Sequence, residues 1–111
     1  MIKNIDIYEL KELIKEENIL IIDVRDVEEY KNNRILNAIN ITVENIKNVM
    51  KICPNKNKKI LVYCSKGIRS IVAAEQLDRF GYTKIYNDRY RCIIWTSYHG
   101  ISYINEKNGK I

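Results

Sequence analysis

The sequence predicts an α/β fold, with a mainly parallel central sheet that is flanked by helices on both faces. Two uninterrupted runs rich in apolar and β-branched residues, 19–24 and 60–63, are typical of strands buried on both sides of a parallel sheet. Segments with apolar residues at helical spacing separate and follow these runs. A length of 111 residues suits one domain, so we expect residues 1–111 to form a single unit with right-handed crossovers.

The N-terminal third is predicted to contain a helix, a buried strand and a short second helix. Apolar residues at helical spacing predict the first helix over residues 7–17, and the strand over residues 19–24 comes next. The second helix is expected to end around residues 32–33. Each helix begins at an aspartate followed three positions later by a glutamate, as in a capping box: Asp6 with Glu9, and Asp26 with Glu29.

The middle of the chain is predicted to hold a brief strand, a helix and the second buried strand. After the strand at residues 38–41, Thr42 can cap a helix that Pro54 stops. The polar loop 55–59 then leads into the strand over residues 60–63. Because strands and helices alternate, we expect an active site beyond the carboxyl ends of the strands.

The C-terminal part is predicted to contain a helix and the last strand. The helix follows a tight loop at residues 64–70, and Gly81 ends it. Residues 83–86 are expected to form the last strand of the fold. The pattern is weakest from about residue 92 onward, where Trp95 is expected to anchor the segment in the core and a polar tail follows.

Composition and charge argue against several classes of function. The 19 basic and 14 acidic residues give a net charge of +5, but no basic stripe interleaved with aromatic residues indicates nucleic-acid binding. The longest apolar run, residues 60–64, is far shorter than the about 20 residues that a membrane-spanning helix requires. The N-terminus has no pattern of a secretory signal, so we expect a cytoplasmic protein.

Cysteine and histidine are too few and too scattered for a metal centre or a disulfide framework. The three cysteines show no C-x-x-C spacing, and His99 is the single histidine. We interpret His99 as a surface or tail residue rather than a catalytic base, and Cys53 as a structural thiol. Cys92 could resolve an oxidised Cys64, although a packed, inert thiol is the favoured interpretation.

Cys64 follows a predicted buried strand and precedes a short loop and a helix. Free backbone N–H groups and the helix dipole at such a position favour negative charge, and hence the nucleophilic thiolate. Lys66 and Arg69 add nearby cations, and Gly67 can take the positive φ that curls consecutive N–H groups around an anion. A lone cysteine at a strand end is also commonly a small buried hydrophobe.

An ordered set of fragments resembles the rhodanese-like family, and specifically its single-domain sulfurtransferases. Each fragment alone is weakly specific, whereas the ordered set covers nearly the whole chain. The fragments are Ile-Ile-Asp-Val-Arg at 21–25 with Glu28, Glu29 and Tyr30, Asn-Ala-Ile-Asn-Ile at 37–41, the six-residue loop from Cys64 to Arg69 with Ser70, Gly-Tyr-Thr-Lys-Ile-Tyr at 81–86, and Trp95.

This resemblance implies a thiosulfate sulfurtransferase that needs no metal or organic cofactor. Cys64 would take a sulfane sulfur from a small anionic donor, hold it as a persulfide and pass it to a thiol, cyanide or protein acceptor. Lys66 and Arg69 resemble the basic loop of members that use thiosulfate, a dianion that needs countercharge. The substrate-binding residues implied are Ser65, Lys66, Gly67, Ile68 and Arg69.

Two rival functions compete with sulfur transfer. Cysteine phosphatases and related arsenate reductases use a wider C-x5-R loop, whereas Cys64 to Arg69 is C-x4-R, so phosphatase activity is disfavoured. The second rival is a catalytically silent rhodanese-like binding or regulatory module, against which the complete loop argues. The physiological donor, the acceptor and the oligomeric state all stay open.

Asp23 and Arg25 have a functional and a structural interpretation. Asp23 stands at the carboxyl end of a predicted strand and could orient the cysteine loop. It could equally cap the next segment, while Arg25 pairs with Glu28 or Glu29. We favour the structural interpretation for both residues and expect neither in the catalytic set.

The sequence departs from the usual family pattern at three places. Asparagines at 33 and 37 stand where glycines are usual, a mild exchange because asparagine tolerates left-handed backbone. Tyr90 and Arg91 replace a Gly-Gly pair, so we expect that turn to differ. If it borders the site, replacing Arg91 by alanine is expected to raise the KM for thiosulfate without unfolding the protein.

Overall fold

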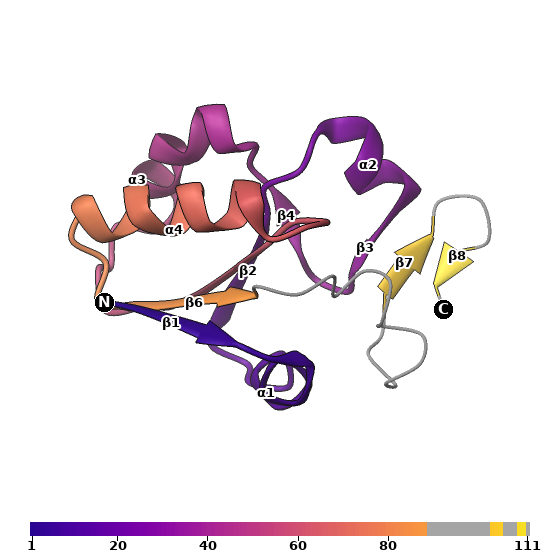
Figure 1. The fold of residues 1–111 in the computed structure, drawn as a ribbon, viewed down its shortest axis with the longest axis horizontal. Helices are drawn as coiled ribbons and strands as arrows, with labels where there is room; N and C mark the ends of the chain where they lie inside the picture. Colours follow the sequence, from indigo (N-terminus) through magenta and orange to yellow (C-terminus); the bar gives the residue numbers. More distant parts are fainter. Residues whose placement is uncertain (89–102, 106–108, 111) are drawn as a thin grey trace.

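Five parallel strands form the central sheet of the computed structural model, which describes residues 1–88, 103–105 and 109–110 (Figure 1). The strands are β1 (Ile2–Ile5), β2 (Ile19–Asp23), β4 (Ile39–Asn40), β5 (Lys59–Tyr63) and β6 (Lys84–Asp88). They lie in the order β1-β6-β5-β2-β4, and every neighbouring pair is parallel. The two apolar runs of the sequence are thus adjacent, with Ile22 opposite Val62. The mainly parallel sheet is confirmed.

Helices cover both faces of this sheet, as predicted. Their bounds are α1 (Ile7–Leu13), α2 (Val27–Asn32), the 3-10 helix η1 (Val43–Asn48), α3 (Val49–Ile52) and α4 (Ile68–Arg79). In Figure 1, α3 and α4 lie on one side of the sheet and α1 lies on the other. Leu10 and Leu13 of α1 pack with Leu61 beneath the sheet, whereas Leu77 of α4 packs with Val62 above it. Burial of these apolar side chains on both faces is the main stabilising force of such a fold.

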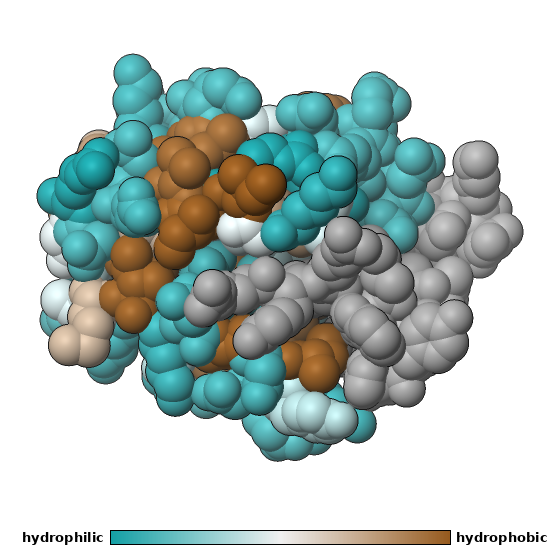
Figure 2. Space-filling view, viewed as in Figure 1, coloured by the Kyte–Doolittle hydropathy of each residue, from teal (hydrophilic) through white to brown (hydrophobic). Residues whose placement is uncertain are grey.

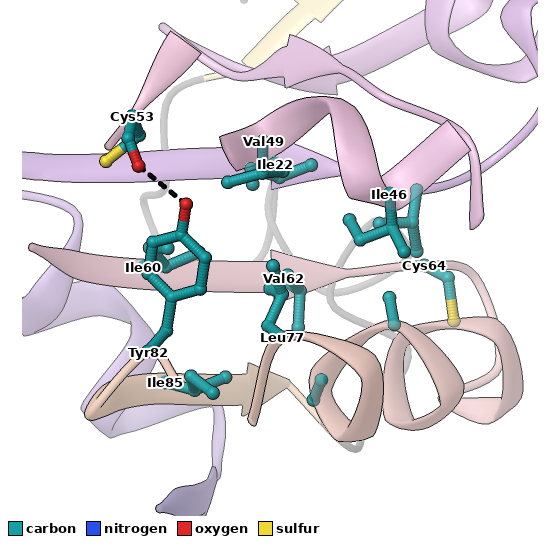
Figure 3. Close-up of a cluster of buried hydrophobic side chains, with 13 residues drawn as sticks. Ile22, Ile46, Val49, Cys53, Ile60, Val62, Cys64, Leu77, Tyr82 and Ile85 are labelled. Atoms are coloured by element: carbon teal, nitrogen blue, oxygen red, sulfur yellow. Dashed lines mark hydrogen bonds between the residues drawn. The ribbon is translucent and has the colours of Figure 1, made fainter. Parts of the chain in front are cut away.

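The core on the α4 side is shown in Figure 3. Tyr82 lies 1% exposed at its edge, and its hydroxyl donates a 2.6 Å hydrogen bond to the carbonyl oxygen of Cys53. Cys53 itself belongs to this core, as its structural interpretation predicted. The Tyr82 hydroxyl therefore satisfies a carbonyl just after α3, where the chain leaves the helix.

Strand β1 was not predicted from the sequence. It has only four residues, and Lys3 and Asn4 in its middle are exposed. It is held as an edge strand against β6, with Ile5 opposite Asp88. A short edge strand needs no continuous apolar run, because only part of it faces the core.

A second sheet corrects the prediction that residues 83–86 hold the last strand. Residues 84–86 of that segment belong to β6, but two further strands follow it, β7 (Tyr103–Asn105) and β8 (Gly109–Lys110). Both join β3 (Asn33–Ile35) in an antiparallel sheet of order β3-β7-β8. The second helix does end at Asn32 as predicted, and the chain turns directly into β3.

Three helix boundaries differ from the prediction. Helix α1 ends at Leu13 rather than residue 17, because Lys15 and Glu16 form only turn-type bonds to carbonyls three residues earlier. The predicted helix between Thr42 and Pro54 is divided into η1 and the single turn α3, with non-helical backbone at Asn45. Helix α4 starts at Ile68, whereas the prediction placed residues 64–70 in the loop before the helix.

Positive φ angles occur where the sequence allows them. Asn37 has a φ of 73°, which agrees with asparagine replacing glycine there, whereas Asn33 is extended and needs no such tolerance. Gly81 closes α4 with a φ of +97°. Among the described residues, no helix combines the length and apolarity that crossing a membrane requires.

Candidate active site

Cys64 lies at the carboxyl end of the sheet, directly after β5 and just before α4. Cys64 is 1% exposed, and Figure 3 shows its sulfur pointing toward α4. The backbone N–H groups of Gly67 and Ser70 point at Sγ, with N–Sγ distances of 3.1 and 3.3 Å. Two N–H donors on one sulfur favour a negatively charged species at that atom.

Gly67 produces this arrangement because its backbone is left-handed. Its φ of 84° turns the loop so that its N–H faces back toward the sulfur, and α4 begins at the next residue. Any residue with a side chain is strained in this backbone conformation. The prediction that Gly67 takes a positive φ is therefore confirmed.

Glu29 of helix α2 ties the two ends of the cysteine loop together. Its carboxylate accepts hydrogen bonds from both terminal nitrogens of Arg69, at 2.6 and 3.1 Å, and from the hydroxyl of Ser65 at 3.1 Å. The hydrogen bond from Arg69, together with its charge, lowers the pKa of Glu29 from 4.5 to about 2. The same pairing raises the pKa of Arg69. Loop and helix are thus joined by an ion pair at neutral pH.

The two basic residues of the loop are therefore not equivalent. Arg69 is already paired with Glu29, whereas Lys66 is exposed and forms no ion pair with any residue from 1 to 88. An anionic donor would meet the charge of Lys66 first. Whether Ser65, Lys66, Gly67, Ile68 and Arg69 bind substrate stays a prediction.

Asp23 and Arg25 form a buried ion pair beside this region. The Arg25 Nη2 to Asp23 Oδ2 distance is 2.7 Å, and the two side chains are 3% and 0% exposed. Asp23 also accepts the backbone N–H of Arg25 at 2.9 Å, which caps the segment after β2 as the structural interpretation predicted. The expected pairing of Arg25 with Glu28 or Glu29 is wrong, because Glu29 turns toward Arg69 instead.

Several sequence predictions concern residues outside those that the structure describes. They are Tyr90, Arg91, Cys92, Trp95 and His99. Within residues 1–88 and the two C-terminal strands, no group of three histidine, cysteine or acidic side chains is arranged to hold a metal ion.

Sequence reasoning missed the role of Glu29. The residue belongs to a fragment that supports the family resemblance, but it lies 40 positions before Arg69, and nothing in that spacing indicates a contact. It also missed Asn4 and Asn87, which are register partners on β1 and β6. Their contact required knowledge of an edge strand that the sequence does not signal.

Comparisons with known proteins agree on one family. The family model described as Rhodanese-like domain matches residues 6–88. The thiosulfate sulfurtransferase GlpE of Coxiella burnetii is 32% identical over 106 residues, which cover 96% of this chain and 98% of that protein.

Solved structures give the same picture. A structure described as a rhodanese with anions from E. coli is 30% identical, with a TM-score of 0.67 over 78% of this chain and 98% of that one. The rhodanese-like domain of the Anabaena protein Alr3790 has a TM-score of 0.81 over 95% of this chain and 81% of its own. Its identity is 20%, so it shows the fold alone.

Proposed function

This chain belongs to the rhodanese-like domain family, and we propose that it is a sulfurtransferase in which Cys64 carries sulfane sulfur from thiosulfate as a persulfide. The observation that carries the proposal is the pair of backbone N–H groups, from Gly67 and Ser70, aimed at Sγ of Cys64. The same donors that favour a thiolate before the reaction also favour the anionic persulfide after it.

The first half-reaction is attack by the Cys64 thiolate on the outer sulfur of thiosulfate. The new S–S bond forms as the S–S bond of thiosulfate breaks, and sulfite leaves with the electron pair. Lys66, exposed beside the cysteine, supplies countercharge for the dianionic donor. The loop geometry is fixed by Glu29, so little reorganisation is needed on binding.

The second half-reaction returns Cys64 to its starting state. A nucleophilic acceptor attacks the outer sulfur of the persulfide, the S–S bond breaks, and Cys64 leaves as a thiolate. Because this thiolate must stay reduced between turnovers, the chemistry supports the predicted cytoplasmic location. No step requires a metal or an organic cofactor.

The proposal is tested by intact mass spectrometry after incubation with thiosulfate. We expect the protein to gain one sulfur atom, and we expect cyanide to remove it. Replacing Cys64 by alanine should abolish the gain, whereas replacing the buried Cys53 by alanine should leave it unchanged. A folded protein that takes up no sulfur would instead support the catalytically silent module.

A further inference from the structure

The charge of Arg69 in the cysteine loop is opposed by two carboxylates of the α2 region. Both terminal nitrogens of its guanidinium bind Glu29, at 2.6 and 3.1 Å, and Nη1 lies 3.9 Å from Oδ2 of Asp26. The hydrogen bond to Glu29 raises the pKa of Arg69 most, and the charges of Cys64 and Asp26 raise it further. The guanidinium is therefore near enough to Cys64 to act on a charged donor, but its own charge is already compensated.

Lys66 is the cation of the loop whose charge is not compensated. It is exposed and forms no ion pair with any residue from 1 to 88. One such ammonium group matches a sulfur donor with one negative charge. A dianion brings a second charge that meets no uncompensated cation within residues 64–70, while the thiolate of Cys64 repels it.

Apolar side chains adjoin the loop where α4 begins. Ile68 is 68% exposed and lines a pocket of about 470 Å³ together with Lys66. Val72, one turn further along α4, is 44% exposed. Figure 2 shows hydrophobic surface over α3 and α4. Such surface favours contact with a methyl or alkyl group, and it offers no compensation to a second anionic oxygen.

We propose that Glu29 determines the donor specificity of Cys64, because it compensates the charge of Arg69 and so shifts the preference from dianionic thiosulfate toward an organic thiosulfonate, a donor with one negative charge. The inference rests on the proposed persulfide at Cys64. The thiolate attacks the outer sulfur of the thiosulfonate, and a new S–S bond forms as the S–S bond of the donor breaks. A sulfinate leaves with the electron pair, so atoms and electrons balance.

Glu29 also positions the loop, since it accepts the hydroxyl of Ser65 at 3.1 Å. These two roles predict different kinetics. A loosened loop slows the attack on every donor, whereas a released charge on Arg69 assists a dianion more than a monoanion. The ratio of kcat/KM for two donors of different charge therefore reports the charge alone.

The test compares thiosulfate with methanethiosulfonate as donors, with cyanide as the acceptor for both. The two donors differ in intrinsic reactivity, so their kcat/KM ratio is compared between variants. Replacing Glu29 by glutamine should raise the ratio of thiosulfate to methanethiosulfonate about tenfold at low ionic strength, because one more positive charge acts on one more negative charge. Replacing the exposed Glu28 by glutamine should leave the ratio unchanged. Equal ratios in the two variants overturn the proposal.

A double variant shows whether the effect passes through Arg69. Adding Arg69→Gln to Glu29→Gln removes the released charge, so the ratio should return toward the wild-type value. A double variant that keeps the raised ratio overturns the assignment to the ion pair.

Two measurements on the wild type keep the outcome decisive. Intact mass after incubation with each donor shows whether Cys64 is loaded: no uptake of sulfur from either donor overturns the proposed function, whereas uptake with an unchanged ratio overturns this inference alone. If the Glu29→Gln variant does not fold, salt dependence decides. Between about 0.1 and 1 M ionic strength, where distant charges are already screened, loading from thiosulfate should slow no more than loading from methanethiosulfonate. A steeper decline for thiosulfate overturns the proposal.

Discussion

Glu29 and Arg69, which lie 40 positions apart in the sequence, form a bidentate ion pair that joins α2 to the start of α4. Both carboxylate oxygens of Glu29 are used, and one of them also accepts the hydroxyl of Ser65. The cysteine loop is therefore clamped at its second and its last residue by one side chain. This fixes the backbone on both sides of the N–H group that Gly67 directs at Cys64.

Replacing Glu29 by glutamine is expected to separate the two kinetic constants for thiosulfate. The amide keeps the size of the side chain but releases the charge of Arg69, so an added cation should lower KM for the dianion. The loosened loop should at the same time lower kcat, by about tenfold, because small displacements at a reacting atom are costly. Steady-state kinetics with cyanide as acceptor measure both constants.

Glu28 provides the matched control for this variant. It is the exposed neighbour on α2, and replacing it by glutamine removes the same charge without touching the loop. Its kinetic constants should equal those of the wild type. Equal kcat values for the two glutamine variants would show that the ion pair does not position the loop.

The lowered pKa of Glu29 predicts a specific loss of stability in acid. The hydrogen bond and charge of Arg69 hold its pKa at about 2 in the folded protein, below the ordinary value of 4.5. A lowered pKa stabilises the fold fully above the unfolded value, and this contribution is lost as the pH falls from about 4.5 toward 2. Urea denaturation across this range should show a steeper decline for the wild type than for the Glu29→Gln variant.

The Glu28→Gln variant should follow the wild-type curve in the same experiment, because Glu28 forms no ion pair with any residue that the structure describes. Parallel curves for the wild type and the Glu29→Gln variant would mean that the ion pair contributes nothing to the pH dependence. The comparison removes the contribution of the carboxylates that lie away from Arg69, because they are common to the three proteins.

The buried pair of Asp23 and Arg25 predicts a large effect on stability. Asp23→Asn leaves the guanidinium, which is 3% exposed, without its anionic partner. Breaking a buried ion pair from one side typically costs about 3 to 5 kcal/mol. The free energy of unfolding from urea titration measures the loss. Changing Arg25 to methionine in the same protein should restore part of it, and a double variant no more stable than the single one would contradict this account.

The sequence predicted the parts of the fold that depend on local pattern. Strands β2 and β5 are central, so burial on both faces forces continuous apolar runs that are visible in any window. The left-handed residue before α4 was likewise predictable, because Gly67 has the residue type and the position that a tight loop needs.

The parts that were missed depend on contacts between distant segments. Strand β1 is held only as an edge beside β6, and its pairing brings Asn4 to Asn87 across 83 positions. Strand β3 is three residues long and gains its partners from the far end of the chain. Arg25 was expected to pair with Glu28 or Glu29, but Asp23 lies two positions from Arg25 and already pairs with it. The local sequence of short polar elements carries too little signal to reveal which distant residues they contact.

Gly67 and Gly81 both have left-handed backbone, but only Gly67 lies in the cysteine loop. Comparing alanine variants at the two positions therefore separates an effect on the chemistry from the cost of backbone strain. Gly67 has a φ of 84° and Gly81 a φ of +97°, and no atom lies within 4 Å of a Cβ added at Gly81. Replacing either by alanine should destabilise the protein by about 1 to 2 kcal/mol, the usual cost of left-handed backbone for a residue with a side chain. Thermal or urea denaturation should therefore give similar losses.

Only the Gly67→Ala variant should impair the chemistry. Relief of the strain turns its N–H away from Sγ of Cys64, which removes one of the two donors that stabilise the anionic sulfur. We expect the rate of sulfur uptake from thiosulfate to fall about 100-fold, in line with loss of one aligned donor at a developing charge. The Gly81→Ala variant should load at the wild-type rate, since its glycine lies at the other end of α4. Equal rates for the two variants would mean that the N–H of Gly67 does not support the persulfide.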